Sequence, residues 1–91
     1  MKFEWDPRKA AINKKKHGVS FKEASTIFGD PDSITFDDPD HSVEEHRFLT
    51  VGKSKAGRVL IVSHTERSNA IRIISARKTT KSEKNSYEDE K

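Results

Sequence analysis

An acidic and a basic side chain that could cooperate in proton transfer lie two residues apart, at Glu45 and Arg47. We expect a strand over residues 45–52, and side chains two apart on a strand point to the same face. A carboxylate beside a guanidinium could act as a general base whose charged partner fixes its position. The same spacing is typical of an ordinary ion pair, so the pattern alone leaves both interpretations open.

Two further candidates are Arg77, which ends the last expected strand, and Tyr87, which lies ten residues on in the helix after it. A planar guanidinium reaches two phosphate oxygens at once, and a tyrosine can donate a proton or stack on a base. The structural alternative is that Arg77 pairs with Glu83 while Tyr87 packs the helix onto the sheet. Arg72 has the opposite parity in a regular strand, so it shares a face with Arg77 only if a bulge intervenes. We favour Arg77 for chemistry and leave Arg72 as a phosphate contact or a structural ion pair.

Histidine is the side chain that exchanges protons near neutral pH. His46 points to the opposite face from its two charged neighbours, and His64 shares a face with apolar residues; neither is excluded as a general acid or base. His17 precedes a glycine, and we interpret it as a cation at the C-terminal end of a helix. Because the histidines lack metal-ligand spacing and the chain has no cysteine, we expect neither a metal site nor a cofactor.

The charges are segregated along the 91 residues, although the net charge is only +3. The net charge is +4 over residues 1–29, −7 over 30–45, +7 over 46–79 and −1 over 80–91. A block of +7 predicts a surface that attracts polyanions, since phosphate neutralisation dominates nucleic-acid affinity. Solvated lysines on a sheet would give the same count, so charge alone does not decide.

The composition excludes several classes of protein. Without cysteine there is no disulfide scaffold, thiolate zinc site or cysteine nucleophile. The chain has no apolar run of about 18 residues, so we expect no membrane span. Its first residues lack the apolar stretch of a signal peptide. We therefore expect one cytoplasmic domain over residues 1–91.

The elements that must position these groups follow from local signals. Asp6 before Pro7, and Ser20 with Glu23, are typical of helix N-termini, whereas Gly18 is typical of a helix C-terminus. Period-two patterns predict strands over residues 2–5, 34–36, 45–52, 58–65 and 70–77, and a polar helix fits 80–90. Short successive connections then predict an α+β fold: strand, two helices, four-stranded antiparallel meander and C-terminal helix, with the helices packed on one side of the sheet.

Several motifs occur together in this order. They are FEWDPRKAAINKKKHGVSFKEA over residues 3–24, Glu45-x-Arg47, Gly57-Arg58, Thr65-x-Arg67, and RIISAR over 72–77 followed by Glu83 and Tyr87. This combination resembles the BrnT family of ribonuclease toxins from type II toxin–antitoxin systems, whose fold is similar to that of RelE. The resemblance extends over residues 3–87, and the first and last blocks together make it specific.

The resemblance implies a metal-independent endoribonuclease toxin that cleaves RNA and so inhibits translation and growth. It implies neutralisation by a BrnA-like ribbon-helix-helix antitoxin in a hetero-oligomer, with DNA contacted only through the antitoxin. The residues that it implies for catalysis are Glu45, Arg47, Arg77 and Tyr87. Those that we expect to follow the RNA backbone are Lys53, Lys55, Arg58, Arg67 and Arg72. The alternative is a non-catalytic RNA- or protein-binding module of an operon-regulating complex, in which the lysines are a solvated hairpin tip.

Overall fold

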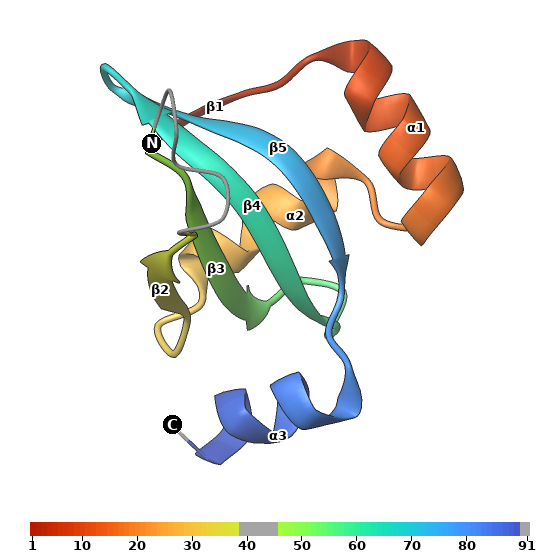
Figure 1. The fold of residues 1–91 in the computed structure, drawn as a ribbon, viewed down its shortest axis with the longest axis vertical. Helices are drawn as coiled ribbons and strands as arrows, with labels where there is room; N and C mark the ends of the chain where they lie inside the picture. The colour runs from red at the N-terminus through yellow and green to blue at the C-terminus, as the bar shows by residue number, and fades with distance from the viewer. Residues whose placement is uncertain (39–45, 90–91) are drawn as a thin grey trace.

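The structure, a computed structural model, describes residues 1–38 and 46–89 (Figure 1). It is a mixed α+β fold built on one five-stranded sheet. The strands are β1 (Lys2–Glu4), β2 (Ile34–Asp37), β3 (Phe48–Lys53), β4 (Val59–Arg67) and β5 (Ala70–Lys78). The helices are α1 (Pro7–His17), α2 (Phe21–Ser25), which continues into the 3-10 turn η1 (Thr26–Gly29), and α3 (Lys81–Asp89). The predicted fold class and element order are confirmed.

The predicted helix ends form through local hydrogen bonds. Asp6 Oδ1 accepts from the backbone N–H of Arg8 at 2.8 Å at the start of α1. Gly18 ends α1 with a φ of 69°, a left-handed conformation that glycine adopts without steric cost. Ser20 Oγ accepts from the backbone N–H of Glu23 at 3.0 Å at the start of α2. These features fix the start and the end of α1 and the start of α2.

The sheet has the strand order β1-β5-β4-β3-β2. Strands β2 to β5 form the predicted antiparallel meander, and β1 pairs in parallel with the first part of β5. The expected strand over 45–52 begins later than predicted. The β2–β3 pairing ends at Asp37, the last residue of β2, which lies opposite Phe48, the first residue of β3. Arg47 therefore precedes β3, and Glu45 lies outside the described residues.

The expectation that the helices pack on one side of the sheet is wrong for α3. Residues of α1, α2, η1 and the segments joining them cover one face, and their apolar side chains meet alternate residues of β4 and β5 there. This first core comprises Val19, Phe21, Ala24, Ile27, Leu60, Val62, Ile73 and Ala76. On the other face, Tyr87 of α3 packs on Val51, Val59 and Ile61. The two cores use opposite parities of β4, so α3 lies across the sheet from the other helices.

A β-bulge in β5 reverses the parity of the strand halfway along it. Ser63 of β4 pairs with Ser75, but the next residue, His64, pairs with Ile73, so Ile74 is an extra residue. Arg72 and Arg77 consequently share the face opposite to α1 and α2. The bulge required for these two arginines to lie together is present.

A buried amide ties α1 to β5 beyond the bulge. The Asn13 side chain donates to the carbonyl of Ala76 at 2.8 Å and accepts from the Ala76 N–H at 3.1 Å. It also donates to the carbonyl of Val19 at 3.0 Å. Asn13 therefore satisfies the edge of β5 where β1 no longer pairs with it.

The Asn13→Ala substitution is expected to lower the free energy of unfolding by roughly 2–4 kcal/mol, because it leaves buried backbone groups of Ala76 and Val19 without partners. The matched control is Ile12→Ala, at a side chain that is 65% exposed in the same helix; we expect less than about 0.5 kcal/mol there. Urea unfolding followed by circular dichroism measures both. Equal effects of the two substitutions would contradict this role for Asn13.

Candidate active site

A small hollow lies on the open face, by which we mean the sheet face opposite to α1 and α2. It has a volume of about 110 Å³. Its lining residues are His17, Leu49, Ile61, Ser63, Ser75, Ala76 and Arg77. We call it the Arg77 hollow. It joins a cation, two hydroxyl groups and an imidazole from three strands and the end of α1.

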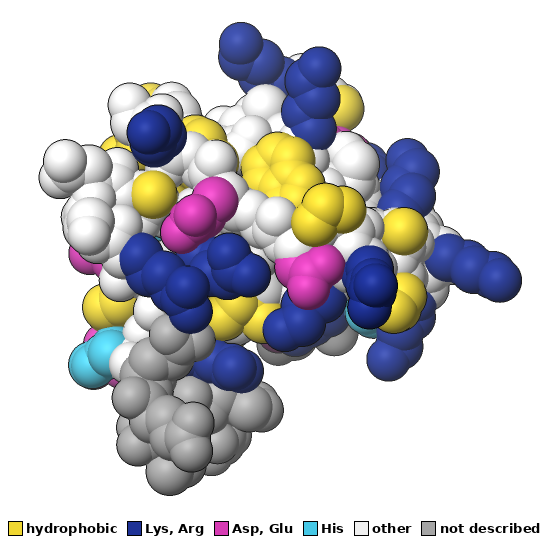
Figure 2. All heavy atoms as spheres, turned by 90° about the horizontal axis from the view of Figure 1, so that it is seen from above, with side chains coloured by type: hydrophobic (Ala, Val, Ile, Leu, Met, Phe, Trp, Pro, Cys, Tyr) yellow, Lys and Arg dark blue, Asp and Glu magenta, His cyan; other side chains and the backbone are white. Residues whose placement is uncertain are grey.

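A second hollow beside α1 shares two residues with the first. It has a volume of about 220 Å³ and is lined by Lys9, Ile12, Asn13, Lys16, His17, Ile74 and Ser75. We call it the α1 hollow. Figure 2 views the end of the molecule that carries β1 and α1, and Lys and Arg side chains surround much of this view while Asp and Glu side chains are few. The linings of the two hollows contain Arg77, Lys9 and Lys16 and, among the described residues, no Asp or Glu, which suits a polyanion.

Arg77 is held by a carboxylate but keeps one edge of its guanidinium available. Its Nη1 and Nη2 donate to the two carboxylate oxygens of Glu83 at 2.8 and 2.9 Å, and Nη1 also donates to the Lys78 carbonyl at 3.1 Å. Its Nε–H and one Nη2–H have no partner among the described residues. These two donors form the side edge of the guanidinium fork, which matches two phosphate oxygens. Arg77 thus combines a fixed orientation with two donors for a ligand.

The Arg77–Glu83 pair also sets the protonation of both groups. The hydrogen bonds from Arg77 lower the pKa of Glu83 to about 2, despite some opposing desolvation. The same bonds raise the pKa of Arg77 above its ordinary value. Both side chains stay charged at neutral pH. The sequence left an Arg77–Glu83 pair open as a structural alternative, and this pair is present.

Tyr87 lies buried under α3 rather than in the Arg77 hollow. The residue is 2% exposed, and its hydroxyl donates a short hydrogen bond to Asp30. Burial and the adjacent Asp30 carboxylate raise the pKa of the phenol. Asp30 Oδ2 also accepts from the backbone N–H of Lys53 at 2.8 Å. In this arrangement Tyr87 anchors α3 to the end of β3.

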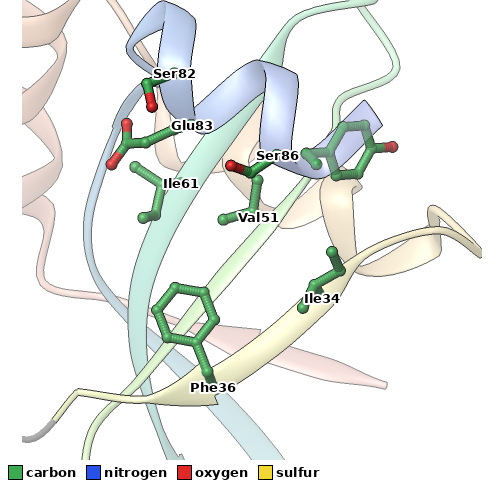
Figure 3. Close-up of a pocket in the computed structure, with 8 residues that line it drawn as sticks. Ile34, Phe36, Val51, Ile61, Ser82, Glu83 and Ser86 are labelled. Carbon is green, nitrogen blue, oxygen red and sulfur yellow. The ribbon is translucent and has the colours of Figure 1, made fainter. Parts of the chain in front are cut away.

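A pocket of about 370 Å³ lies between α3 and the sheet (Figure 3). Apolar side chains from three strands form one wall, and α3 forms the other. Its lining residues are Ile34, Phe36, Val51, Ile61, Ser82, Glu83, Ser86 and Tyr87. No lysine or arginine is among them, so this pocket does not suit the phosphate backbone of a nucleic acid.

Arg58 does not join the other cations on the open face. Its Nε donates to Glu23 Oε2 at 2.9 Å, and its Nη2 donates to the Gly18 carbonyl at 3.1 Å. Hydrogen bonds from Arg58 and Ser54 to the Glu23 carboxylate lower the pKa of Glu23. We expected Arg58 to follow an RNA backbone. In the structure its side chain instead joins the β3–β4 hairpin to α2.

The remaining predicted cations lie in four places. Arg72 is half-buried on the open face and makes no hydrogen bond or ion pair with any described residue, whereas Arg67 is exposed near the β4–β5 turn. Arg47 is half-buried just before β3. Lys53 and Lys55 are exposed at the β3–β4 hairpin, and the Lys55 backbone N–H donates to the Thr26 hydroxyl of η1. Among all the predicted site cations, the fold brings Arg72 and Arg77 to one face of one strand.

The two histidines left open by the sequence are both engaged elsewhere. His64 is 2% exposed on the face covered by α1 and α2, and burial lowers its pKa to about 4. Its Nε2 lies 2.7 Å from the Thr50 hydroxyl. His46 lies 2.9 Å from an Asp37 oxygen, and its ring stacks on Phe48. Neither lines the Arg77 hollow.

Sequence reasoning missed His17 and Ser75 as site residues. The local pattern explains His17 as a helix end, and Ser75 lies within the RIISAR motif, in which only the two arginines are assigned a role. The signal that could have found them is Ile73 followed directly by Ile74, since two adjacent apolar residues break the strand alternation and indicate a bulge. With the parity corrected, Ser75 and Arg77 fall on the same face as Arg72.

Within the described residues no group of three His, Cys, Asp or Glu side chains could hold a metal ion. None of the described helices is long and apolar enough to cross a membrane.

Comparison with known proteins gives one family and one fold. The family model described as the ribonuclease toxin BrnT of type II toxin–antitoxin systems matches residues 5–83. The 1.1 Å crystal structure of the Brucella abortus ribonuclease toxin BrnT is similar, with a TM-score of 0.70 and 21% sequence identity, over 89% of this chain and 99% of that chain. At this identity the likeness shows the fold. No curated protein matches the chain.

Replacing Tyr87 by phenylalanine is expected to lower the free energy of unfolding by about 1–3 kcal/mol, because Asp30 loses a buried hydrogen-bond donor. Cleavage of RNA, measured below the unfolding transition, should persist. Asn85→Ala, at an exposed position of α3, is the control and should change neither. Loss of cleavage with unchanged stability would instead assign the hydroxyl to the chemistry.

Acid should weaken the attachment of α3 through Glu83. Because the folded pKa of about 2 lies below the ordinary value of 4.5, the Arg77–Glu83 pair stabilises the fold above pH 4.5, and this stabilisation is lost as the pH falls from 4.5 toward 2. The free energy of unfolding of a Glu83→Gln variant should therefore fall less over this range than that of the wild type. Glu88→Gln, at an exposed acid of the same helix, should follow the wild-type curve; parallel curves for all three proteins would refute this.

Proposed function

This chain belongs to the BrnT family of ribonuclease toxins from type II toxin–antitoxin systems, and on that basis we propose that it cleaves RNA on the open face of its sheet. The observation that carries the proposal is the placing of Arg72 and Arg77 on one face by the bulge at Ile74. Arg77 then offers two N–H donors to a phosphate while Glu83 holds its other edge.

The reaction that suits this site is attack of a ribose 2′-oxygen on the adjacent phosphate. The new bond between the 2′-oxygen and phosphorus forms as the bond from phosphorus to the 5′-oxygen breaks, which leaves a cyclic phosphate and a 5′-hydroxyl. Negative charge grows on the phosphate oxygens on the way. Preorganised donors aimed at such charge supply a large part of many enzymes' rate acceleration, and Arg77 would supply two of them. No metal ion is needed in this scheme.

Other cations would hold the RNA in register. We propose that Arg72 and Arg67 contact phosphates along β5 and the β4–β5 turn, and that Lys53 and Lys55 add attraction at the far hairpin. Glu45, with Arg47 two residues away, stays our prediction for the general base that removes the 2′-hydroxyl proton. Such contacts give affinity that falls with salt, because binding releases counterions from the RNA.

We further propose that the cleavage inhibits translation and growth in the cytoplasm. Membership of a toxin family supports a protein partner that neutralises the activity. The expected partner is a BrnA-like ribbon-helix-helix antitoxin in a hetero-oligomer, through which alone the complex would contact DNA. Co-expression of that antitoxin should restore growth.

One observation favours the second candidate, a non-catalytic RNA- or protein-binding module. Tyr87 is buried and Arg77 is paired with Glu83, and this arrangement is what purely structural roles for these residues would also give. This candidate predicts RNA binding without product and no growth arrest on expression.

The test is cleavage of an end-labelled single-stranded RNA in the presence of EDTA. Arg77→Ala should lower the single-turnover rate by roughly 10²–10³-fold, as removal of one oxyanion donor does in other enzymes. Arg77→Lys should recover little, because an ammonium group lacks the planar fork. Lys78→Ala, at the exposed neighbouring position, is the matched control and should cut at the wild-type rate.

Thermal unfolding of each variant separates a loss of activity from a loss of fold. An Arg77→Ala variant that cuts as fast as the wild type would contradict the role of Arg77. Wild-type protein that binds RNA without cutting it would favour the binding module.

A further inference from the structure

We propose that His17 is the general acid of the cleavage, donating a proton to the departing 5′-oxygen. The inference rests on the proposed function and deepens it. His17 lines both the Arg77 hollow and the α1 hollow, and Ser75 is the other residue that the two share. An imidazole therefore lies where the hollow lined by lysines of α1 meets the hollow lined by Arg77.

The fold fixes the place of His17 from two sides. It is the last residue of α1, four positions after Asn13, and side chains four apart in a helix lie on one face. Asn13 is hydrogen-bonded through both atoms of its amide to Ala76, whose neighbours Ser75 and Arg77 line the hollow. The glycine that follows ends the helix immediately. The imidazole is thus set against β5 at the level of Arg77.

The other described histidines and the tyrosine lie elsewhere. His64 is buried on the opposite face, and His46 is hydrogen-bonded to Asp37 beside β2. The Tyr87 hydroxyl is turned into the protein toward Asp30. His17 is the described histidine that shares a hollow with Arg77.

The proton inventory of the step balances. The general base takes the proton of the 2′-hydroxyl as the 2′-oxygen bonds to phosphorus. As the bond to the 5′-oxygen breaks, a ring N–H of protonated His17 passes its proton to that oxygen, and the leaving group departs as a neutral alcohol. Arg77 meanwhile binds the non-bridging oxygens. Neutral His17 regains a proton from water before the next turnover.

A leaving group that needs no proton tests this role directly. Two RNA oligonucleotides of one sequence would be compared, one with the natural 5′-oxygen and one with a bridging 5′-sulfur, which departs as a stable thiolate. His17→Gln should slow cleavage of the oxygen substrate by about 10²–10⁴-fold and change cleavage of the sulfur substrate little. The branch of the wild-type pH–rate profile that falls at high pH should disappear in the variant.

The matched control is Lys15→Gln, at an exposed position of the same helix outside both hollows; it should cut both substrates like the wild type. RNA affinity and thermal unfolding of His17→Gln should match the wild type. Equal slowing on both substrates, or no slowing on either, would overturn the general-acid role. Wild-type protein that cuts neither substrate would overturn the proposed function itself.

Discussion

The extra residue at Ile74 is the constraint on which the arrangement of the open face depends. Without it, Arg72 and Arg77 would lie on opposite faces of β5, and a buried position on the helix side would receive a charged side chain. The bulge costs one break in the β4–β5 ladder. Just past it, the Asn13 amide takes over as partner of the strand edge. One irregularity in a strand and one buried amide together determine which cations face the same way.

The ion pairs of this protein do two different kinds of work. Arg58 and Glu23 join the β3–β4 hairpin to α2, and Arg58 also donates to the Gly18 carbonyl, so its side chain is held away from the open face. Arg77 and Glu83 join β5 to α3, but only one edge of the guanidinium is used. Both arginines donate to one carboxylate through two nitrogens, so the two pairs do not differ in charge. They differ in which edge of the guanidinium the carboxylate occupies. A count of basic residues along the chain therefore overstates how many can meet a ligand.

Local chemistry made the helix ends and the meander predictable. Asp6, Gly18 and Ser20 act within a few residues of themselves, so their roles are visible in a short stretch of sequence. Contacts between distant segments were not visible in this way. Glu23 lies 35 residues from Arg58, and Asp30 lies 57 residues from Tyr87, so no periodic pattern reveals either pair. The sequence predicts Arg77 as a candidate site residue. It does not single out His17, because a position at the end of a helix already explains that residue.

Asp30 has a consequence for how such sequences can diverge. Its carboxylate accepts from the phenol of α3 and from the backbone of β3 at once. Loss of the phenol removes one of the two donors to the half-buried Asp30 carboxylate, whereas loss of the acid removes the acceptor of both the Tyr87 hydroxyl and the Lys53 N–H. Selection should thus hold the acid more tightly than the phenol, and a lineage that replaces the acid must supply another acceptor for the strand.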